Sequence, residues 1–290
     1  MSITFNRDYL DKLLTKYIND NYDENIFKEM AKYCLFDGKG IRPLIIKDIY
    51  ANAANAANAA NAANAANAAI AANAANAAIC DNLMVSIELL HTASLILDDM
   101  PFMDDDTMRR GKPCVHIKYS IESSKKLVNK FINHSIRLIY EVVNDNETIK
   151  NILDILQDTT FGQYIDLFNK IPQTADTYKK CELLCLKTST LFNLAFLFGA
   201  VSCGLSKTSQ SKFVEMGSLF GKLFQISDDF EDCIEDLERG RKMNHVNLLG
   251  RDTSLELFNE FKSELENKLK QSSGYSIFFA KLIEKMSSRI

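Results

Sequence analysis

A long apolar helix that ends in a dense group of carboxylates is the feature that most constrains how this chain folds. From about Cys80 the sequence is apolar with helical periodicity. It then carries five aspartates within nine residues, Asp98, Asp99, Asp104, Asp105 and Asp106. Carboxylates this close repel one another, so they require cations. Hard oxygen donors suit Mg²⁺, and the RRGKP turn that follows offers partners for phosphate groups. The stretch indicates a metal-dependent diphosphate site.

A proline interrupts this first aspartate group. Pro101 lacks an N–H and its ring clashes with the preceding turn, so it should disturb the helix. Asp98 and Asp104 are six residues apart, which is not a helical spacing. We expect the distortion to bring Asp104 back beside Asp98.

A second carboxylate group lies in the segment FQISDDFEDCIED. Asp228, Asp232 and Asp236 are spaced at i, i+4 and i+8, on one helical face. Gln225 precedes them by three residues, and Asp229 flanks the face. A solvated acidic helix end is the alternative interpretation of either group alone. Both groups follow strongly apolar segments, SLIL and GKLFQI, which a solvent-facing run seldom does. Together they indicate paired metal-binding motifs.

Few residues in this chain break helices. Four prolines and eleven glycines in 290 residues favour an all-α protein with a substantial core. The net charge of −4 and the lack of a basic block argue against nucleic-acid binding.

The cysteines and the apolar segments help to predict the cellular compartment of the protein. Seven scattered cysteines without a CxxC pair are typical of reduced cytosolic thiols. Cys181 and Cys185 share a helix face but lack further ligands nearby in the sequence, so we expect them to pack in the core. We find no signal peptide, no C-terminal lipidation box and no apolar span of 18 residues. We therefore expect a soluble cytoplasmic protein without stable membrane insertion.

A tandem Asn-Ala-Ala repeat occupies residues 51–79. Asparagine recurs at every third position from Asn52 to Asn76, except at Ile70. With about 3.6 residues per turn, this period winds around a helix, so no apolar stripe forms. Alanine favours a helix and asparagine opposes it. We predict a low-complexity insertion at about residues 51–78, either frayed helix or disordered; a partner-binding arm is the alternative.

The motifs DDMPFMD, RRGKP and DDFED, in this order, resemble those of the trans-isoprenyl diphosphate synthases, or polyprenyl synthetases. The resemblance covers nearly the whole chain. It implies one polyprenyl synthetase domain over residues 1–290, with the isoprenoid synthase fold. In that fold about ten mostly antiparallel helices surround a central cavity, and the two aspartate motifs face each other across its mouth. It also implies a homodimer.

The resemblance further implies which residues bind the two substrates. DGKGIRP resembles the family's GGKRxRP signature, although Gly40 replaces the usual middle arginine. An ordinary helix–helix turn with exposed cations is the alternative. Isopentenyl diphosphate would be bound by Lys39, Arg42, His91 and Arg110. The allylic diphosphate would be bound by Arg109, Lys187, Thr188, Gln225 and Lys242. GQYID resembles the family's GQxxD, and terminal Arg289 is expected near the cavity entrance.

Three Mg²⁺ ions would be the cofactors. Their expected ligands are Asp98, Asp99, Asp104, Asp228 and Asp232, and Asp229 and Lys187 join the expected catalytic set. Loss of the allylic diphosphate would leave a cation, which isopentenyl diphosphate attacks through its double bond.

Ala93 and Ser94 lie about 6–7.5 Å before Asp98 along the helix. Family members that stop at fifteen carbons commonly have an aromatic ring at the Ala93 position, which closes the cavity floor. The resemblance therefore implies that the small side chains here favour geranylgeranyl diphosphate as product. The alternatives are a farnesyl diphosphate synthase, a terpene cyclase or a non-catalytic regulatory subunit.

Overall fold

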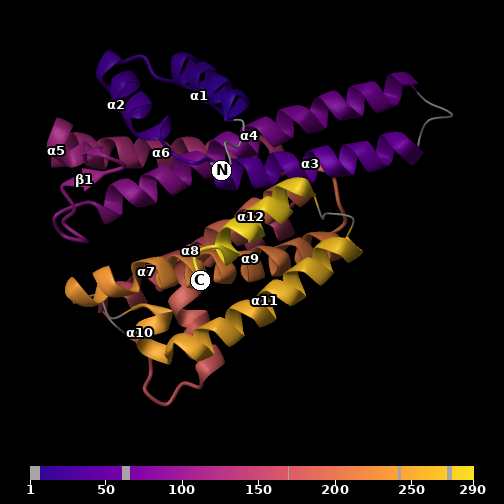
Figure 1. The fold of residues 1–290 in the computed structure, drawn as a ribbon. Coiled ribbons are helices and arrows are strands. Elements are labelled where there is room, and N and C mark those ends of the chain that lie inside the picture. Colours follow the sequence, from indigo (N-terminus) through magenta and orange to yellow (C-terminus); the bar gives the residue numbers. More distant parts are fainter. Residues whose placement is uncertain (1–6, 61–65, 169, 241–242, 273–275) are drawn as a thin grey trace. The chain divides into compact units, whose positions relative to one another are not determined.

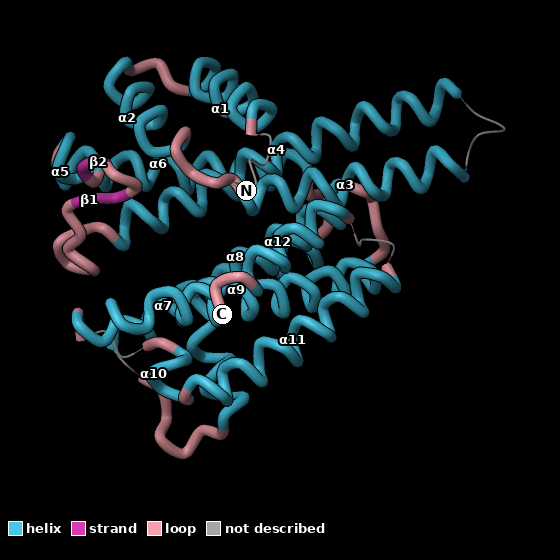
Figure 2. Tube along the Cα trace, viewed as in Figure 1, coloured by secondary structure: helices cyan, strands magenta, loops and turns pink. Residues whose placement is uncertain are grey.

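The computed structural model describes residues 7–60, 66–168, 170–240, 243–272 and 276–290, with the backbone alone for 54–60 and 66–73. These residues form twelve helices and two very short strands, which confirms the all-α prediction (Figures 1 and 2). The chain divides into two compact units. The first unit comprises residues 1–47 and 65–144, and the second comprises residues 48–64 and 145–290.

The first unit is organised around the helix that carries the first aspartate motif. This helix, α4, packs against α6, and the buried hydroxyls of Ser86 and Ser135 meet at 2.7 Å between them. Apolar side chains of the two helices, such as Leu83, Ile87 and Phe131, are fully buried. Its elements are α1 (Asp8–Asn21), α2 (Asn25–Leu35), the start of α3 (Ile41–Ala60), α4 (Ala66–Asp98), α5 (Val115–Tyr119) and α6 (Ile121–Val142).

A β-hairpin follows α4 in the first unit. Strands β1 (Met108–Arg109) and β2 (Lys112–Pro113) pair antiparallel, with Arg109 opposite Lys112. The two residues between them, Arg110 and Gly111, have φ angles of 53° and 76°. Positive φ at both central residues is the mark of a type I′ turn. The predicted RRGKP turn is therefore confirmed as a tight hairpin.

The second unit is built around α8 (Thr177–Ser202), which packs against both α7 (Asn146–Phe168) and α9 (Lys207–Glu238). Asp176 and Ser206 cap the N-termini of α8 and α9 with their side chains. Phe196 and Phe220 contact Phe279 of α12 in a buried aromatic core. Its elements are α7 (Asn146–Phe168), α8 (Thr177–Ser202), α9 (Lys207–Glu238), α10 (His245–Leu249), α11 (Arg251–Gln271) and α12 (Ile277–Ser287), with the end of α3.

The described part of the Asn-Ala-Ala repeat is helical. Helix α3 continues into it as far as Ala60, and α4 begins within it at Ala66. Residues 61–65 lie outside the described residues. Of the two predicted states, frayed helix or disorder, the described residues take the helical one because alanine dominates the composition.

The expectation of no apolar span of 18 residues was wrong. Among the described residues, Ala74–Asp98 and Thr177–Ser202 are long and apolar enough to cross a membrane, with mean hydropathies of 1.3 and 1.5. Most of each span is buried inside the protein, 61% and 67% respectively. A helix at the centre of a packed unit must be apolar on every side, so it resembles a membrane span in composition.

Candidate active site

The first aspartate motif begins where α4 ends. The helix stops at Asp98, three residues before Pro101. The chain then turns back, and the backbone N–H of Asp104 donates to the carbonyl of Asp98 at 2.9 Å. The predicted return of Asp104 to Asp98 is therefore confirmed for the backbone. Asp98 and Asp99 are buried, whereas Asp104 is exposed.

Asp99 is held by the hairpin that follows. The Arg109 Nε donates to its carboxylate at 2.5 Å, and the same guanidinium lies 3.8 Å from Asp106. Asp99, Arg109 and Arg110 line one pocket of the first unit, together with Lys112. Lys112 is itself paired with Asp37. Cations therefore lie beside Asp99 and Asp106 of the first aspartate motif, where they offset its negative charge.

A second polar group of the first unit joins α3 to α4. The Arg42 guanidinium lies 3.1 Å from the His91 Nε2. Burial and the positive charges of Arg42 and Arg110 hold the pKa of His91 well below its usual value, so the ring is neutral. Burial also lowers the pKa of Arg110, although the buried Glu88 carboxylate opposes that shift. Arg42, His91 and Arg110, predicted from three separate motifs, belong to one electrostatic cluster.

Three other predicted residues of the first unit occupy different environments. Lys39 is exposed. Ala93 is buried at 2% exposure, while Ser94 is half-buried and donates to the His91 carbonyl at 2.9 Å. The structure therefore encloses Ala93 more completely than Ser94, and their role in product length stays a prediction.

In the second unit, a glycine allows α7 to contact the backbone at Lys187. A Cβ on Gly162 would lie 2.4 Å from the Lys187 backbone nitrogen. The close approach places Asp166 of the GQYID motif 3.1 Å from the Lys187 ammonium. The aspartate of this motif therefore holds the lysine that the sequence assigns to the allylic diphosphate.

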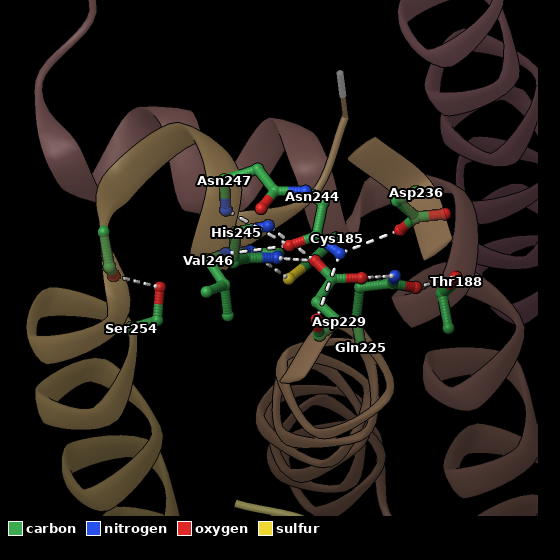
Figure 3. Close-up of polar contacts among 11 residues, drawn as sticks. Cys185, Thr188, Gln225, Asp229, Asp236, Asn244, His245, Val246, Asn247 and Ser254 are labelled. Carbon is green, nitrogen blue, oxygen red and sulfur yellow. Dashed lines mark hydrogen bonds and ion pairs between the residues drawn. The ribbon is translucent and has the colours of Figure 1, made fainter. Parts of the chain in front are cut away.

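A second close approach positions Thr188 against α9. A Cβ on Gly221 would lie 2.4 Å from the Ser189 Cα, so only glycine allows this separation of the helices. One turn later on the same face of α9, the Gln225 carbonyl accepts a hydrogen bond from the Thr188 hydroxyl at 2.5 Å. Two residues predicted from separate motifs are thus directly bonded (Figure 3).

One further turn along this face lies Asp229. It is buried at 4% exposure, accepts from the Gln225 amide at 2.7 Å, and lies 2.5 Å from the His245 Nδ1 (Figure 3). The backbone N–H of His245 also donates to it at 2.7 Å. Burial opposes a charge on His245, but the bonds to Asp229 and Cys181 outweigh it and raise the pKa of the imidazole to about 9. Asp229 therefore anchors α10.

The remaining carboxylates of the second motif follow the predicted face. Asp228 is half-buried and forms an ion pair with Arg289, whose Nε also lies 3.1 Å from Glu231. Asp232 is exposed; partial burial, followed by the charges of Asp236 and Glu231, raises its pKa. Like charges so close together disfavour one another's ionised form. Arg289 thus contacts the second motif, and its place at a cavity entrance stays a prediction.

The structure therefore gathers the predicted residues into two sets. In the first unit Asp99 is bonded to Arg109, and Arg42 lies beside His91; in the second, Thr188 is bonded to Gln225. Lys242 lies outside the described residues. Sequence reasoning singled out the GQYID motif but not the pairing of its Asp166 with Lys187, 21 residues away. It missed His245, because its partner Asp229 is 16 residues away.

Superposition on solved structures identifies the class of fold. A geranyltranstransferase from Thermotoga maritima superposes with a TM-score of 0.76 over 98% of this chain and 97% of its own, at 20% identity. A geranyltransferase from Helicobacter pylori, in complex with magnesium and isoprenyl diphosphate, gives 0.68 over 99% and 97%, at 19% identity. The fold is that of the isoprenoid synthases.

The sequence comparison is more specific. A family model for polyprenyl synthetase matches residues 24–270, so the chain belongs to the polyprenyl synthetase family. A short chain isoprenyl diphosphate synthase of Methanothermobacter thermautotrophicus is 33% identical over 53% of this chain and 47% of its own length. Geranylgeranyl pyrophosphate synthase 12 of Arabidopsis thaliana is 27% identical over 63% and 57%. The chain thus spans about half the length of these relatives.

Proposed function

We propose that this protein is a magnesium-dependent prenyltransferase that joins isopentenyl diphosphate to allylic diphosphates, with geranylgeranyl diphosphate as its main product. The observation that carries the proposal is that a member of the polyprenyl synthetase family keeps both aspartate motifs and the cations beside the first. The relative from Arabidopsis thaliana is a geranylgeranyl pyrophosphate synthase, which supports the choice of product.

The donor set fits magnesium. Both motifs offer carboxylate oxygens alone, which are the ligands that magnesium prefers, and a cation would relieve the repulsion among these charges. The residues that would hold three ions are Asp98, Asp99, Asp104, Asp228 and Asp232. When bound, magnesium neutralises the charge that develops on a leaving diphosphate. The Helicobacter pylori structure, which contains magnesium and isoprenyl diphosphate, supports this choice.

The side chains of this chain would bind and orient the substrates. Lys187, placed by Asp166, would bind the allylic diphosphate together with Arg109 and Lys242. The Thr188 oxygen would face the allylic cation, because Gln225 fixes the orientation of its hydroxyl.

Isopentenyl diphosphate would be bound by cations of the first unit. Lys39, Arg42 and Arg110 would contact its diphosphate, and neutral His91 would act as a hydrogen-bonding partner. The allylic C–O bond breaks, the double bond of isopentenyl diphosphate attacks the cation, and the released diphosphate takes the proton. This reaction requires no general base from the protein.

Product length would depend on the space along α4. A methyl group at Ala93 and a hydroxymethyl group at Ser94 cannot close a cavity beneath Asp98, whereas an aromatic ring could. The tail should therefore grow beyond fifteen carbons, to about twenty. Farnesyl diphosphate is the alternative product.

One assay tests the proposal. The isolated protein is incubated with Mg²⁺, labelled isopentenyl diphosphate and, in turn, dimethylallyl, geranyl and farnesyl diphosphate. Elongation of the allylic chain supports the proposal. Release of a hydrocarbon from an allylic diphosphate alone would identify a terpene cyclase instead. No conversion in either arm would indicate a non-catalytic subunit, and both of these results would overturn the assignment.

The partners and compartment are part of the same proposal. We expect a homodimer in the cytoplasm, with no nucleic acid and no membrane insertion, in which residues 1–290 act as one domain. The burial of most of both long apolar helices supports a core role for them. Light scattering after size-exclusion chromatography measures the dimer, and a purely monomeric mass would contradict it.

A further inference from the structure

A cluster of soft metal ligands lies in the second unit, behind the second aspartate motif. Cys181 and Cys185 are one turn apart on α8, and His245 begins α10; all three are fully buried. The two sulfur atoms and an imidazole nitrogen lie within 4.8 Å of one another. Figure 3 shows the Cys185 sulfur directed toward His245, at 3.4 Å from its Nε2.

The spacing matches a tetrahedral zinc centre. Zinc binds cysteine sulfur at about 2.3 Å and histidine nitrogen at about 2.0–2.1 Å. Tetrahedral angles then place a sulfur and a nitrogen ligand about 3.6 Å apart, and two sulfurs about 3.8 Å apart. The observed 3.4 Å between the Cys185 sulfur and the His245 Nε2 is close to the expected sulfur–nitrogen distance. The expected sulfur–sulfur distance is likewise shorter than 4.8 Å, within which all three ligand atoms lie. A thiol–imidazole hydrogen bond has a similar length, so other features must distinguish the two.

The orientation of His245 is the first such feature. Asp229 lies 2.5 Å from the imidazole Nδ1 and accepts the backbone N–H of the same residue. The Nδ1 is thereby directed to a carboxylate, and Nε2 is directed to the sulfurs. A carboxylate on the distal nitrogen of a histidine ligand is the usual second-sphere arrangement at protein zinc sites.

Charge is the second feature. A divalent ion bound by two thiolates and a neutral imidazole has no net charge, which a fully buried site tolerates. Binding releases the displaced protons to solvent, and no electron is transferred. The exposed carboxylates of the second motif lack sulfur and nitrogen donors, so they attract hard cations instead.

We propose that Cys181, Cys185 and His245 bind a zinc ion that fastens α10 to α8. Tetrahedral zinc takes four ligands, and these residues supply three of them. The site is separate from the magnesium ligands Asp228 and Asp232, and its presence does not depend on the proposed prenyl transfer. Asp229 links it to Gln225 of the predicted substrate site, because its carboxylate contacts His245 and accepts from the Gln225 amide.

Metal content tests the proposal. The full chain is incubated with zinc, freed of excess metal by gel filtration, and measured by mass spectrometry of its metals. We expect about one zinc per chain in the wild type and in Cys203→Ser, a matched control at the end of α8 whose sulfur bonds to the Ile49 carbonyl instead. Cys181→Ser and Cys185→Ser should each contain at least ten-fold less zinc than the wild type. Zinc retained in both variants, or absent from the wild type, would overturn the proposal.

A cobalt measurement on the wild-type protein tests the proposal even if the variants misfold. Wild-type protein loaded with Co²⁺ in place of zinc should show visible absorption of tetrahedral cobalt together with a thiolate-to-cobalt charge-transfer band. Far-ultraviolet circular dichroism of each variant identifies misfolding. Wild-type protein that gives no such bands holds only a thiol–imidazole hydrogen-bonded cluster, and the zinc proposal is then refuted.

Discussion

Replacing Gly162 with alanine should impair catalysis more than folding. The new Cβ would lie 2.4 Å from the Lys187 backbone nitrogen, whereas ordinary contact begins at 3.4 Å. All three of its nearest atoms belong to the backbone of α8, so no side chain can move aside. The helices must therefore separate by about 1 Å, the difference between these two distances. Lys187 and its partner Asp166 lie at the displaced point.

Two effects of this substitution on the free energy of unfolding have opposite signs. Overpacking a helix contact costs roughly 1–3 kcal/mol, while alanine in place of glycine stabilises a helix by about 1 kcal/mol. The net loss is about 1 kcal/mol, which would lower Tm by roughly 2–4 °C in a domain of this size. Catalysis has no such compensation, because misplacing a substrate-binding group by about 1 Å can cost roughly 100-fold.

The assay compares kcat/KM for an allylic diphosphate with Tm in the same preparations. Thr160→Ala is the control: it lies two residues earlier on α7, is exposed, and removes only a local bond to the Leu156 carbonyl. It should leave kcat/KM unchanged. If Gly162→Ala keeps kcat/KM within two-fold of the wild type, the positioning role of this contact is refuted.

Three further outcomes follow from the site. Asp98→Asn and Asp228→Asn should each lower kcat by about 100-fold or more with unchanged circular dichroism, because they remove charge that holds the cation; near-native rates at saturating Mg²⁺ would contradict the metal assignment. Ala93→Tyr should shift the product from geranylgeraniol to farnesol, measured by chromatography after dephosphorylation; a wild type that stops at farnesol would contradict the assignment. Burial raises the pKa of Glu88 above 4.5, so the folded state favours its protonated form. Wild-type stability relative to Glu88→Gln should then be greatest below pH 4.5 and fall as pH rises through the raised pKa, measured by urea unfolding; a constant difference would contradict this.

The local geometry of the first aspartate motif was predictable from its sequence. Proline cannot continue a helix, so the interruption at Pro101 and the return of Asp104 follow from local chemistry. The helical periodicity of the second motif likewise placed Asp228 and Asp232 on one face. These features depend on residues within two turns of one another, and such short-range rules are the strongest that a sequence contains.

Long-range contacts were not predictable in the same way. Asp229 sits next to Asp228 in the motif, yet it is buried and bonded to His245 on another helix. The expectation that Cys181 and Cys185 pack in the core is confirmed by their burial. No further ligand lies near them in the sequence, but the fold brings His245, 60 residues beyond Cys185, beside them. No local pattern indicates which loop will deliver a partner across such a distance.

In the hairpin, the positive charge of Arg110 comes at a cost in the free energy of unfolding. Arg110 occupies a left-handed backbone conformation, where an L-amino acid with a side chain costs roughly 1–2 kcal/mol more than glycine. Gly111 takes the other left-handed position without that cost. A laboratory selection for heat resistance alone would therefore favour glycine at position 110. It would enrich chains that withstand higher temperature but have lost a guanidinium beside the first aspartate motif. Such a screen therefore also needs a selection step that retains anion binding.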